Sequence, residues 1–354
     1  MQPLGAGPLP LRVTSQAPMR LGVPVKILAD PSLKSNDARR WQSGPHLRVS
    51  LEYLDAILDH LDRRDIRMYR MSSDLAPYAT HPDMPQFHSM VRECAPELAA
   101  IGAKARRLGI RLSFHPSQFV VINSPDPTLV AKSVADLASQ AEMLDRMEQG
   151  PEAVVIIHTG GHYGDRQAAL ERWARNWEDL PEPVQRRLVL ENDDLRFDAA
   201  DVLWLHEHTG VRLIFDHQHF WCLNRQGLEV ASTFRRFLAS WPEGQRPKMH
   251  FSSPRTEMRE VKRPVPGTRR METKLIPPVW TGHADFINPF EFATFLRLVP
   301  EAVFDVMLEG KAKDLALERL RADLPRYAPD VGLRFGFAPV ASEDAPVEEA
   351  EAAE

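Results

Sequence analysis

The strongest constraint on the fold is a regular alternation of short apolar runs with longer amphipathic segments. Segments such as 50–64 and 127–147 carry apolar residues at i, i+3, i+4 and i+7, which is typical of a helix with one buried face. The apolar runs between such segments are 20–25, 66–71, 110–115, 153–158, 187–192, 211–216, 248–252 and 303–309. Eight strands, each followed by a helix, predict an α/β protein with a single (β/α)8 TIM barrel. Two doubly wound domains are the alternative, but no change in composition divides the middle of the chain.

The ends of the chain differ from its middle. The 354 residues carry a formal net charge of −5, yet residues 341–354 alone contain six acidic and no basic side chains. We therefore expect a flexible N-terminal segment at 1–18, the barrel at 19–328 and a flexible acidic tail at 329–354. Within the barrel, residues 254–275 hold seven Lys or Arg against three Glu, and their prolines and glycine exclude a long helix. We expect an extended basic loop there.

The sequence offers no signal for a membrane or for secretion. No apolar stretch approaches the roughly 20 residues that cross a bilayer. The first 18 residues lack a leading basic cluster, and proline and glycine interrupt their apolar part, so we expect no signal peptide. Cys94 and Cys222 belong to no CxxC motif, which suits a reducing compartment. We expect a cytoplasmic monomer.

Histidines and carboxylates stand at or just after the ends of six predicted strands. They are His115, His158, Glu191, Asp216 with His219, His250 and Glu309. In a parallel barrel the carboxyl ends of all strands meet at one mouth, where active sites are built. So many ionisable groups close together would be costly to bury, and metal ions are the simplest compensation. The set exceeds one tetrahedral site and has no thiolate, which favours two or three Mn, Zn or Fe ions.

Further candidates lie in loops over the same mouth. We expect His283, directly after the basic loop, to be a ligand, and His81 to be a ligand or a phosphate contact. We expect His162 to lie outside the ligand set. Lys248 precedes His250 by two residues and therefore points to the same side of the strand. Nearby cations would lower its pKa, and the sequence leaves open an ordinary lysine or a carboxylated one.

The stretch "HPSQF", 115–119, breaks off the third strand. Pro116 turns the chain after His115, which predicts that Gln118 and Phe119 stand at the rim of the barrel. Phe119 has two interpretations. It either begins the apolar run "FVVI" and packs on neighbouring loops, or it is an exposed aromatic side chain that stacks on nucleic-acid bases.

Several blocks of the sequence resemble, in order, those of the UV damage endonuclease family. They are "YRMSSDLAPYATHP", "LSFHPSQFV", "IIHTGGHYGD", "LVLENDD", "IFDHQHFWCLN", "KMHFSSP", "HADFI" and "DVMLEGKAKD", and they run from about residue 20 to 325. The resemblance implies a TIM barrel like that of endonuclease IV and a cluster of two or three ions, usually manganese, with zinc or magnesium as alternatives. It also implies hydrolysis of double-stranded DNA immediately 5′ to cyclobutane pyrimidine dimers and 6-4 photoproducts, leaving a 3′-hydroxyl and a 5′-phosphate.

The resemblance also implies roles for particular residues. The ligand pattern of the family falls on His115, His158, Glu191, Asp216, His219, His250, His283 and Glu309. We expect His115, Glu191 and Lys248 to be catalytic, and Gln118, Phe119, His81, Arg269 and Arg270 to contact DNA or the lesion. The family's Gln-Tyr pair is Gln118-Phe119 here, which favours the stacking interpretation of Phe119. A tyrosine common in the first strand is replaced by Val23, which puts one contact near the site in doubt.

Three other functions compete with this one. A sugar isomerase or epimerase on a similar barrel would need neither so many histidines nor a basic segment. An apurinic-site endonuclease would share the metals but would accept a missing base instead of a bulky lesion. A DNA-binding module without activity would not require a multinuclear metal site.

Overall fold

The structure is a computed structural model that describes residues 17–339, so the expectations for 1–16 and 340–354 lie outside the described residues. The barrel strands are β1 (Leu21–Pro24), β2 (Met68–Arg70), β3 (Arg111–Ser113), β4 (Val155–His158), β5 (Leu188–Glu191), β6 (Arg212–Ile214), β7 (Lys248–Phe251) and β10 (Asp305–Leu308). They form two parallel sheets, β3-β2-β1-β10-β7 and β4-β5-β6. Single parallel bridges, Phe114↔Val155 and Asp216↔His250, join the sheets into a closed ring. The predicted TIM barrel is confirmed.

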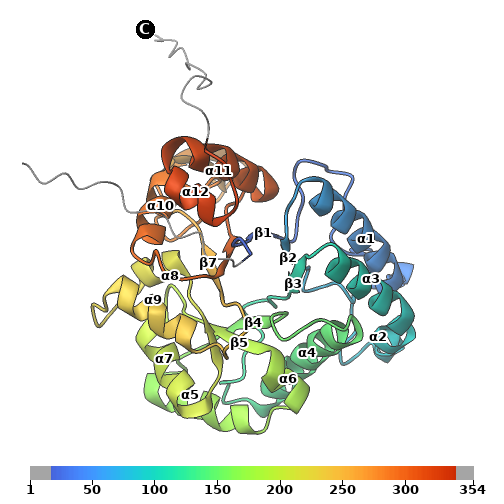
Figure 1. The fold of residues 1–354 in the computed structure, drawn as a ribbon. Helices are drawn as coiled ribbons and strands as arrows, with labels where there is room; N and C mark the ends of the chain where they lie inside the picture. Colours follow the sequence, from blue (N-terminus) through green and yellow to red (C-terminus); the bar gives the residue numbers. More distant parts are fainter. Residues whose placement is uncertain (1–16, 340–354) are drawn as a thin grey trace, which may run out of the picture.

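Helices surround the ring and cover its outer surface (Figure 1). They are α1 (Leu47–Arg63), α2 (Met90–Glu93), α3 (Ala95–Arg107), α4 (Pro127–Arg146), α5 (Arg166–Glu178), α6 (Glu182–Arg187), α7 (Ala199–Thr209), α8 (His217–Cys222), α9 (Val230–Ala239), α10 (Pro289–Arg297), α11 (Lys313–Tyr327) and α12 (Pro329–Arg334). Two 3₁₀ turns, η1 (Trp41–Ser43) and η2 (Pro85–Phe87), lie in loops. Within residues 17–339, no helix is both long and apolar enough to cross a bilayer.

The core has two parts. The larger part lies between strands and helices, where side chains such as Leu112 and Leu190 are fully buried. The smaller part comprises Val154, Ile156, Val189, Ile214 and Trp241. Successive side chains of a strand point to opposite sides of the sheet. The strand residues of this smaller group therefore share the inner side of the barrel, away from the larger core.

The amino end of the barrel is closed by buried charge. The Arg111 guanidinium lies 2.9 Å from the Asp305 carboxylate, and both side chains are almost completely buried. Arg111 and Arg212 also lie over the ring of Trp241, at 5.5 and 5.0 Å. A buried pair of this kind is costly to break, so this end of the barrel serves stability and leaves the opposite end for the site.

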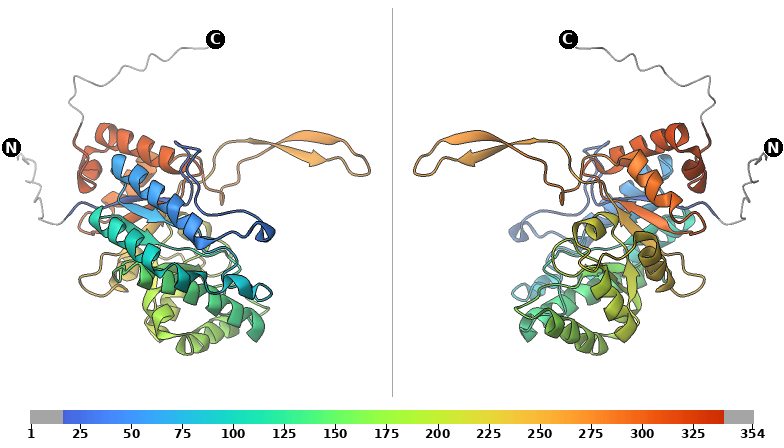
Figure 2. Two further views of the ribbon diagram at one scale, coloured as in Figure 1. Left: turned by 90° about the vertical axis from the view of Figure 1, so that its right-hand side faces the viewer. Right: turned by 90° about the vertical axis from the view of Figure 1, so that its left-hand side faces the viewer.

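Residues 254–275 correct one expectation, because they include an antiparallel β-ribbon. The strands β8 (Arg259–Pro264) and β9 (Met271–Ile276) pair along their whole length, and the ribbon projects far from the barrel (Figure 2). At its tip the Thr268 amide donates to the Val265 carbonyl at 3.1 Å, and Gly267 has a φ of 74°. The expectation of a loop was wrong because Pro266-Gly267 is a type II turn signal between two strand-forming runs.

The folded part of the chain also extends further toward the C-terminus than expected. Val331 and Phe335 are buried against the core, and the Arg334 guanidinium donates to the carbonyls of Leu296, Val299 and Ala302. Residues 329–339 are therefore part of the fold, and their assignment to a flexible tail was wrong. The acidic composition that motivated it begins at residue 341, beyond the described residues.

Candidate metal centre at the barrel mouth

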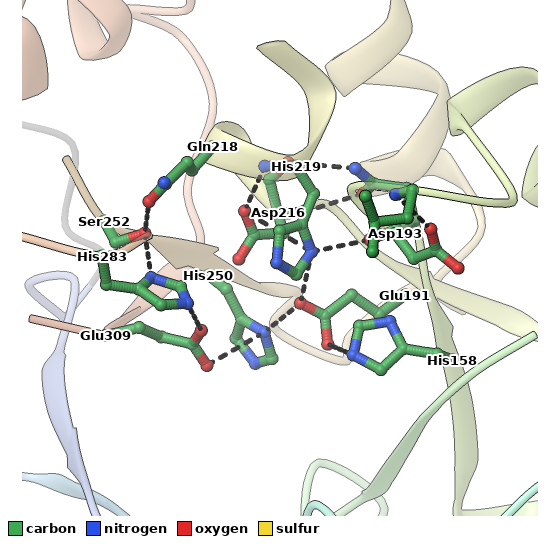
Figure 3. A network of polar contacts seen from close by, with 12 residues as sticks. His158, Glu191, Asp193, Asp216, Gln218, His219, His250, Ser252, His283 and Glu309 are labelled. Carbon is green, nitrogen blue, oxygen red and sulfur yellow. Dashed lines mark hydrogen bonds and ion pairs between the residues drawn. The ribbon is translucent and has the colours of Figure 1, made fainter. Parts of the chain in front are cut away.

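The site residues continue the inward-facing positions of the strands. His158 follows Ile156 by two residues, Glu191 follows Val189, and Asp216 follows Ile214, so each lies on the same side as the small inner core. The same spacing on β7 places His250 above Lys248. The apolar interior thus ends in a polar layer at the carboxyl ends of the strands, where the residues of Figure 3 converge.

Glu191 is the hub of this layer. One carboxylate oxygen, Oε1, lies 2.7 Å from Nδ1 of His250 and 3.6 Å from Nδ1 of His219. The other, Oε2, lies 3.0 Å from Nε2 of His115 and 3.9 Å from Nε2 of His158. The Glu191 side chain is 1% exposed. Four imidazoles from four different elements therefore meet one buried carboxylate.

A second carboxylate, Glu309, lies on the opposite side of His250. Its Oε1 is 3.5 Å from His250 Nδ1, and its Oε2 is 3.9 Å from His283 Nε2. The Arg70 guanidinium donates to Glu309 Oε1 at 2.5 Å and lies 2.9 Å from His250 Nε2. The Arg70 guanidinium therefore lies between the Glu309 carboxylate and the His250 imidazole.

Asp216 is held by the start of α8. It is the N-cap of this helix, and its Oδ1 accepts a hydrogen bond from the His219 amide at 2.8 Å. Asn192 clamps the same turn, because its side-chain oxygen accepts from the Asp216 amide at 2.9 Å and its side-chain nitrogen donates to the Asp216 carbonyl at 3.1 Å. The cap places Asp216 and His219 on the same wall of the site.

Hydrogen bonds fix the ring orientation of three histidines. Nδ1 of His115 contacts the Pro116 carbonyl at 3.0 Å, and Nδ1 of His219 contacts the Asn192 carbonyl at 2.9 Å. A carbonyl only accepts, so both Nδ1 atoms carry the proton and leave Nε2 available. Nδ1 of His283 lies 2.6 Å from Ser252 Oγ. Such outer contacts set the tautomer of metal-binding histidines.

Burial opposes the charged form of each carboxylate, and the neighbours decide the outcome. At Glu191 the imidazoles of His250 and His158 outweigh burial and hold the pKa well below its usual range. At Glu309 the cation of Arg70, followed by His250, also overcomes burial and lowers the pKa. At Asp216 burial prevails and raises the pKa well above its ordinary value.

The histidines divide in a similar way. Burial lowers the pKa of His158 and His283, and it lowers that of His250 to about 4. Burial also opposes the charge on His219, but the nearby carboxylates, Asp216 first, raise its pKa to about 9. The neutral imidazole is the form that binds a metal ion. Three of these four histidines are therefore already in that form at neutral pH.

Lys248 lies below the polar layer. Its side chain is 1% exposed, and its Nζ donates to Ser113 Oγ at 3.0 Å. Burial, and then the cations of Arg70 and Arg111, lower the pKa of Lys248 well below its ordinary value. Burial and these cations therefore disfavour the charged form of the amine at the floor of the site.

The residues present fit a group of divalent cations. Three sets of residues could each hold an ion, because the ligand atoms within a set lie within 4.8 Å of one another. The sets are His115, Glu191 and His250; Glu191, Asp216 and His219; and Asp216, His250 and Glu309. Asp216 Oδ2 and His158 Nδ1 are buried without a hydrogen-bond partner among the described residues, which is costly unless something else binds them. Nitrogen and oxygen ligands without sulfur suit Mn, Zn or Fe.

The remaining candidates lie around the cluster. His81 lines a surface pocket of about 570 Å³ together with Pro116 and Ser117, and its Nδ1 accepts from the Asp83 amide at 3.2 Å. His162 lies apart from the three ligand sets, with Nε2 at 2.9 Å from the Arg196 carbonyl.

Phe119 is 73% exposed, more than any other large apolar side chain of the described chain. Gln118 beside it is exposed as well, whereas the run that follows, Val120 to Ile122, is buried. The interpretation of Phe119 as a side chain packed on neighbouring loops was therefore wrong, and the buried part of the apolar run begins one residue later. At the first strand Val23, in place of the family's tyrosine, is fully buried.

Sequence reasoning missed the residues that hold the ligands. Arg70 was read only as part of a strand, although an arginine at the last position of a barrel strand faces the mouth where carboxylates gather. Asn192 and Ser252 directly follow strand residues, but nothing in their type distinguishes them from ordinary loop residues. Gln218, whose Oε1 accepts from Ser252 Oγ, was missed for the same reason.

Comparisons with known proteins point to one family. The family described as UV-endonuclease UvdE matches residues 48–331. A UV DNA damage endonuclease of Bacillus velezensis is 34% identical over 266 residues, which cover 73% of this chain and 75% of that protein. The crystal structure of SacUVDE has a TM-score of 0.69 at 29% identity and covers 86% of this chain and 98% of that one. A 3-keto-D-glucoside 4-epimerase, YcjR from E. coli, shares the fold alone, with a TM-score of 0.51 at 11% identity over 86% of this chain and 99% of that one. The chain belongs to the UV-endonuclease family.

Proposed function

We propose that the protein incises double-stranded DNA immediately 5′ to UV photoproducts, both cyclobutane pyrimidine dimers and 6-4 photoproducts, by hydrolysis. The single observation that carries the proposal is the buried layer centred on Glu191, in which imidazoles and carboxylates from five strand ends form three overlapping ligand sets. The layer lies at the mouth of a barrel whose family is a nuclease family. We infer that the protein acts in the cytoplasm as a monomer.

Two or three divalent ions, manganese first, would be held by His115, His158, Glu191, Asp216, His219, His250, His283 and Glu309. Such ions, when bound, activate water and stabilise the attacking and leaving oxygens of a phosphodiester. The chain itself orients the ligands. Carbonyl oxygens fix His115 and His219 in the Nε2-binding tautomer, and Arg70 keeps Glu309 ionised. At the floor of the site, Nζ of Lys248 donates to Ser113 Oγ at 3.0 Å, and burial lowers its pKa well below its ordinary value.

The rim would recognise the lesion. A photoproduct weakens base stacking, and extruding the damaged bases leaves a gap in the helix. Exposed Phe119 offers a stacking surface, and the amide of Gln118 offers a donor and an acceptor beside it. His81 would contact a phosphate from its pocket next to Pro116 and Ser117. Arg269 and Arg270, at the tip of the ribbon, would contact the DNA backbone.

The purified protein should contain two or three divalent ions per chain, because the overlapping ligand sets offer more atoms than one ion takes. Stripping the ions with a chelator should abolish incision, and manganese should restore it. Elemental analysis of the purified chain checks the count. One ion per chain or fewer would contradict the cluster.

The nick should carry a 3′-hydroxyl and a 5′-phosphate, because direct attack on the phosphorus releases the 3′ oxygen and forms no enzyme-linked intermediate. A DNA polymerase should therefore extend from the nick without further processing. Extension is measured on a duplex with one photoproduct at a defined position, and a duplex nicked chemically with a 3′-phosphate provides the blocked control. If the polymerase failed to extend from the nick, the proposed 3′-hydroxyl and 5′-phosphate ends would be wrong.

A further inference from the structure

The ribbon formed by β8 and β9 has two chemically different faces. Directly paired residues of an antiparallel ribbon share a face, and the register runs from Arg259↔Ile276 to Pro264↔Met271. We call one face the cationic face; it consists of Arg259, Val261, Arg263, Glu272, Lys274 and Ile276. We call the other the apolar face; it consists of Glu260, Lys262, Pro264, Met271, Thr273 and Leu275.

The charges on the two faces are unequal. The cationic face carries three basic side chains against one carboxylate, whereas the apolar face carries one of each. Glu272 pairs with Lys274 at 2.8 Å, so Arg259 and Arg263 provide most of the available positive charge. Met271 and Leu275, on the apolar face, are 59% and 58% exposed.

The root of the ribbon is fixed beside the metal centre. Pro254 forms a bridge with His283, and the Arg255 amide donates to the Gly282 carbonyl at 2.7 Å. The Arg255 side chain donates to the His283 carbonyl at 3.1 Å and to Asp285 at 2.9 Å. The ribbon leaves the barrel on the side where the loop after β1 also protrudes (Figure 2). DNA bound over the mouth would therefore pass beside it.

The ribbon has the dimensions and the exposure of a binding arm. Six residues per strand correspond to roughly 20 Å, about the diameter of a DNA duplex. The sheet contains only these two strands among residues 17–339, and an isolated two-stranded ribbon is at best marginally stable in water. A charged arm of this kind gains order when a surface of opposite charge lies along it.

We propose that the cationic face of the ribbon lies along the phosphates of duplex DNA outside the lesion, with Arg259 and Arg263 as its main contacts. The apolar face then points away from the DNA. The proposal rests on the proposed function for its substrate class, and it adds a second DNA-binding element with a defined side. Phosphate contacts position the duplex and carry no information about the lesion, so this face binds damaged and undamaged DNA alike.

The test measures binding of the full chain to an undamaged duplex of roughly 30 base pairs by fluorescence anisotropy at several salt concentrations. Losing two phosphate contacts in the double variant Arg259→Gln/Arg263→Gln should lower the affinity roughly 50-fold at about 0.1 M salt and make the slope of log K against log salt shallower by about 2. Arg259→Lys/Arg263→Lys, which keeps the charge, should retain most of the affinity.

Two variants of the apolar face serve as matched controls. Met271→Gln/Leu275→Gln and Lys262→Gln should bind within about twofold of the parent, because neither touches the face that we assign to DNA. The proposal that DNA binds the cationic face would be wrong if the double arginine variant kept wild-type affinity. It would also be wrong if the apolar-face variants lost as much affinity as the double arginine variant. Melting temperatures show that each variant is folded.

The binding test uses undamaged DNA and is therefore independent of catalysis. Incision of irradiated DNA is measured separately, under single-turnover conditions with enzyme in excess. Wild-type protein that binds through the cationic face but does not incise would refute the proposed function and leave the binding face standing. Incision by the wild type without sided binding would refute the ribbon proposal alone.

Discussion

Replacing Glu191 by glutamine should reduce incision of UV-damaged DNA by at least about 100-fold. Mutation of a residue that only supports a metal ligand typically costs 10- to 100-fold, and Glu191 would be a ligand itself. The amide keeps the shape of the side chain but loses the charge that faces four imidazoles. The measurements are the single-turnover rate of nicking and the metal content of the variant.

Glu291→Gln provides a matched control. Glu291 is a partly buried carboxylate near the mouth, and its Oε2 accepts from Ser253 Oγ at 2.6 Å, but it belongs to none of the three ligand sets. This variant should keep its metals and nearly all of its activity. Equal activity of the two variants would show that incision does not depend on the charge of Glu191.

Replacing Phe119 by alanine should lower the affinity for photoproduct DNA by roughly 10- to 100-fold, because stacking of a base on an aromatic ring contributes about 1–3 kcal/mol. The melting temperature should change little, since the ring is 73% exposed and contributes little to the core. Phe119→Tyr should be nearly neutral, because it preserves the stacking surface. Binding to damaged and undamaged duplexes is compared by anisotropy.

The pattern of losses distinguishes recognition from packing. Phe119→Ala should leave the affinity for undamaged DNA almost unchanged, whereas loss of phosphate contacts weakens both. A sharp fall in melting temperature with normal incision would show that the residue supports the fold and that another side chain recognises the lesion.

The barrel could be predicted from the sequence because short runs rich in apolar residues alternate with longer amphipathic segments of helical periodicity. The position of the site followed from the same periodicity. His158, Glu191 and Asp216 each come two residues after a buried inward-facing residue, so the alternation that fills the barrel also aims these side chains into its mouth. The alternation of side chains along each strand agrees with the barrel fold, and the positions of these site residues could therefore be predicted from the sequence.

The parts that could not be predicted depend on contacts between distant segments. Arg70 lies 180 positions from His250 and 239 from Glu309, and its type alone does not indicate a place among metal ligands. The ribbon was misread because proline and glycine end helices and also make hairpin turns. Residues 329–339 were misassigned because their order comes from Arg334 binding carbonyls of the segment 296–302.

The most direct test incubates the purified protein with UV-irradiated, depurinated and intact supercoiled plasmid, each with manganese and with a chelator. We expect nicking of the irradiated plasmid in the presence of metal, little nicking of the other two, and none with the chelator. Preferential nicking of depurinated plasmid, or nicking of irradiated plasmid that persists in the chelator, would contradict a metal-dependent UV endonuclease.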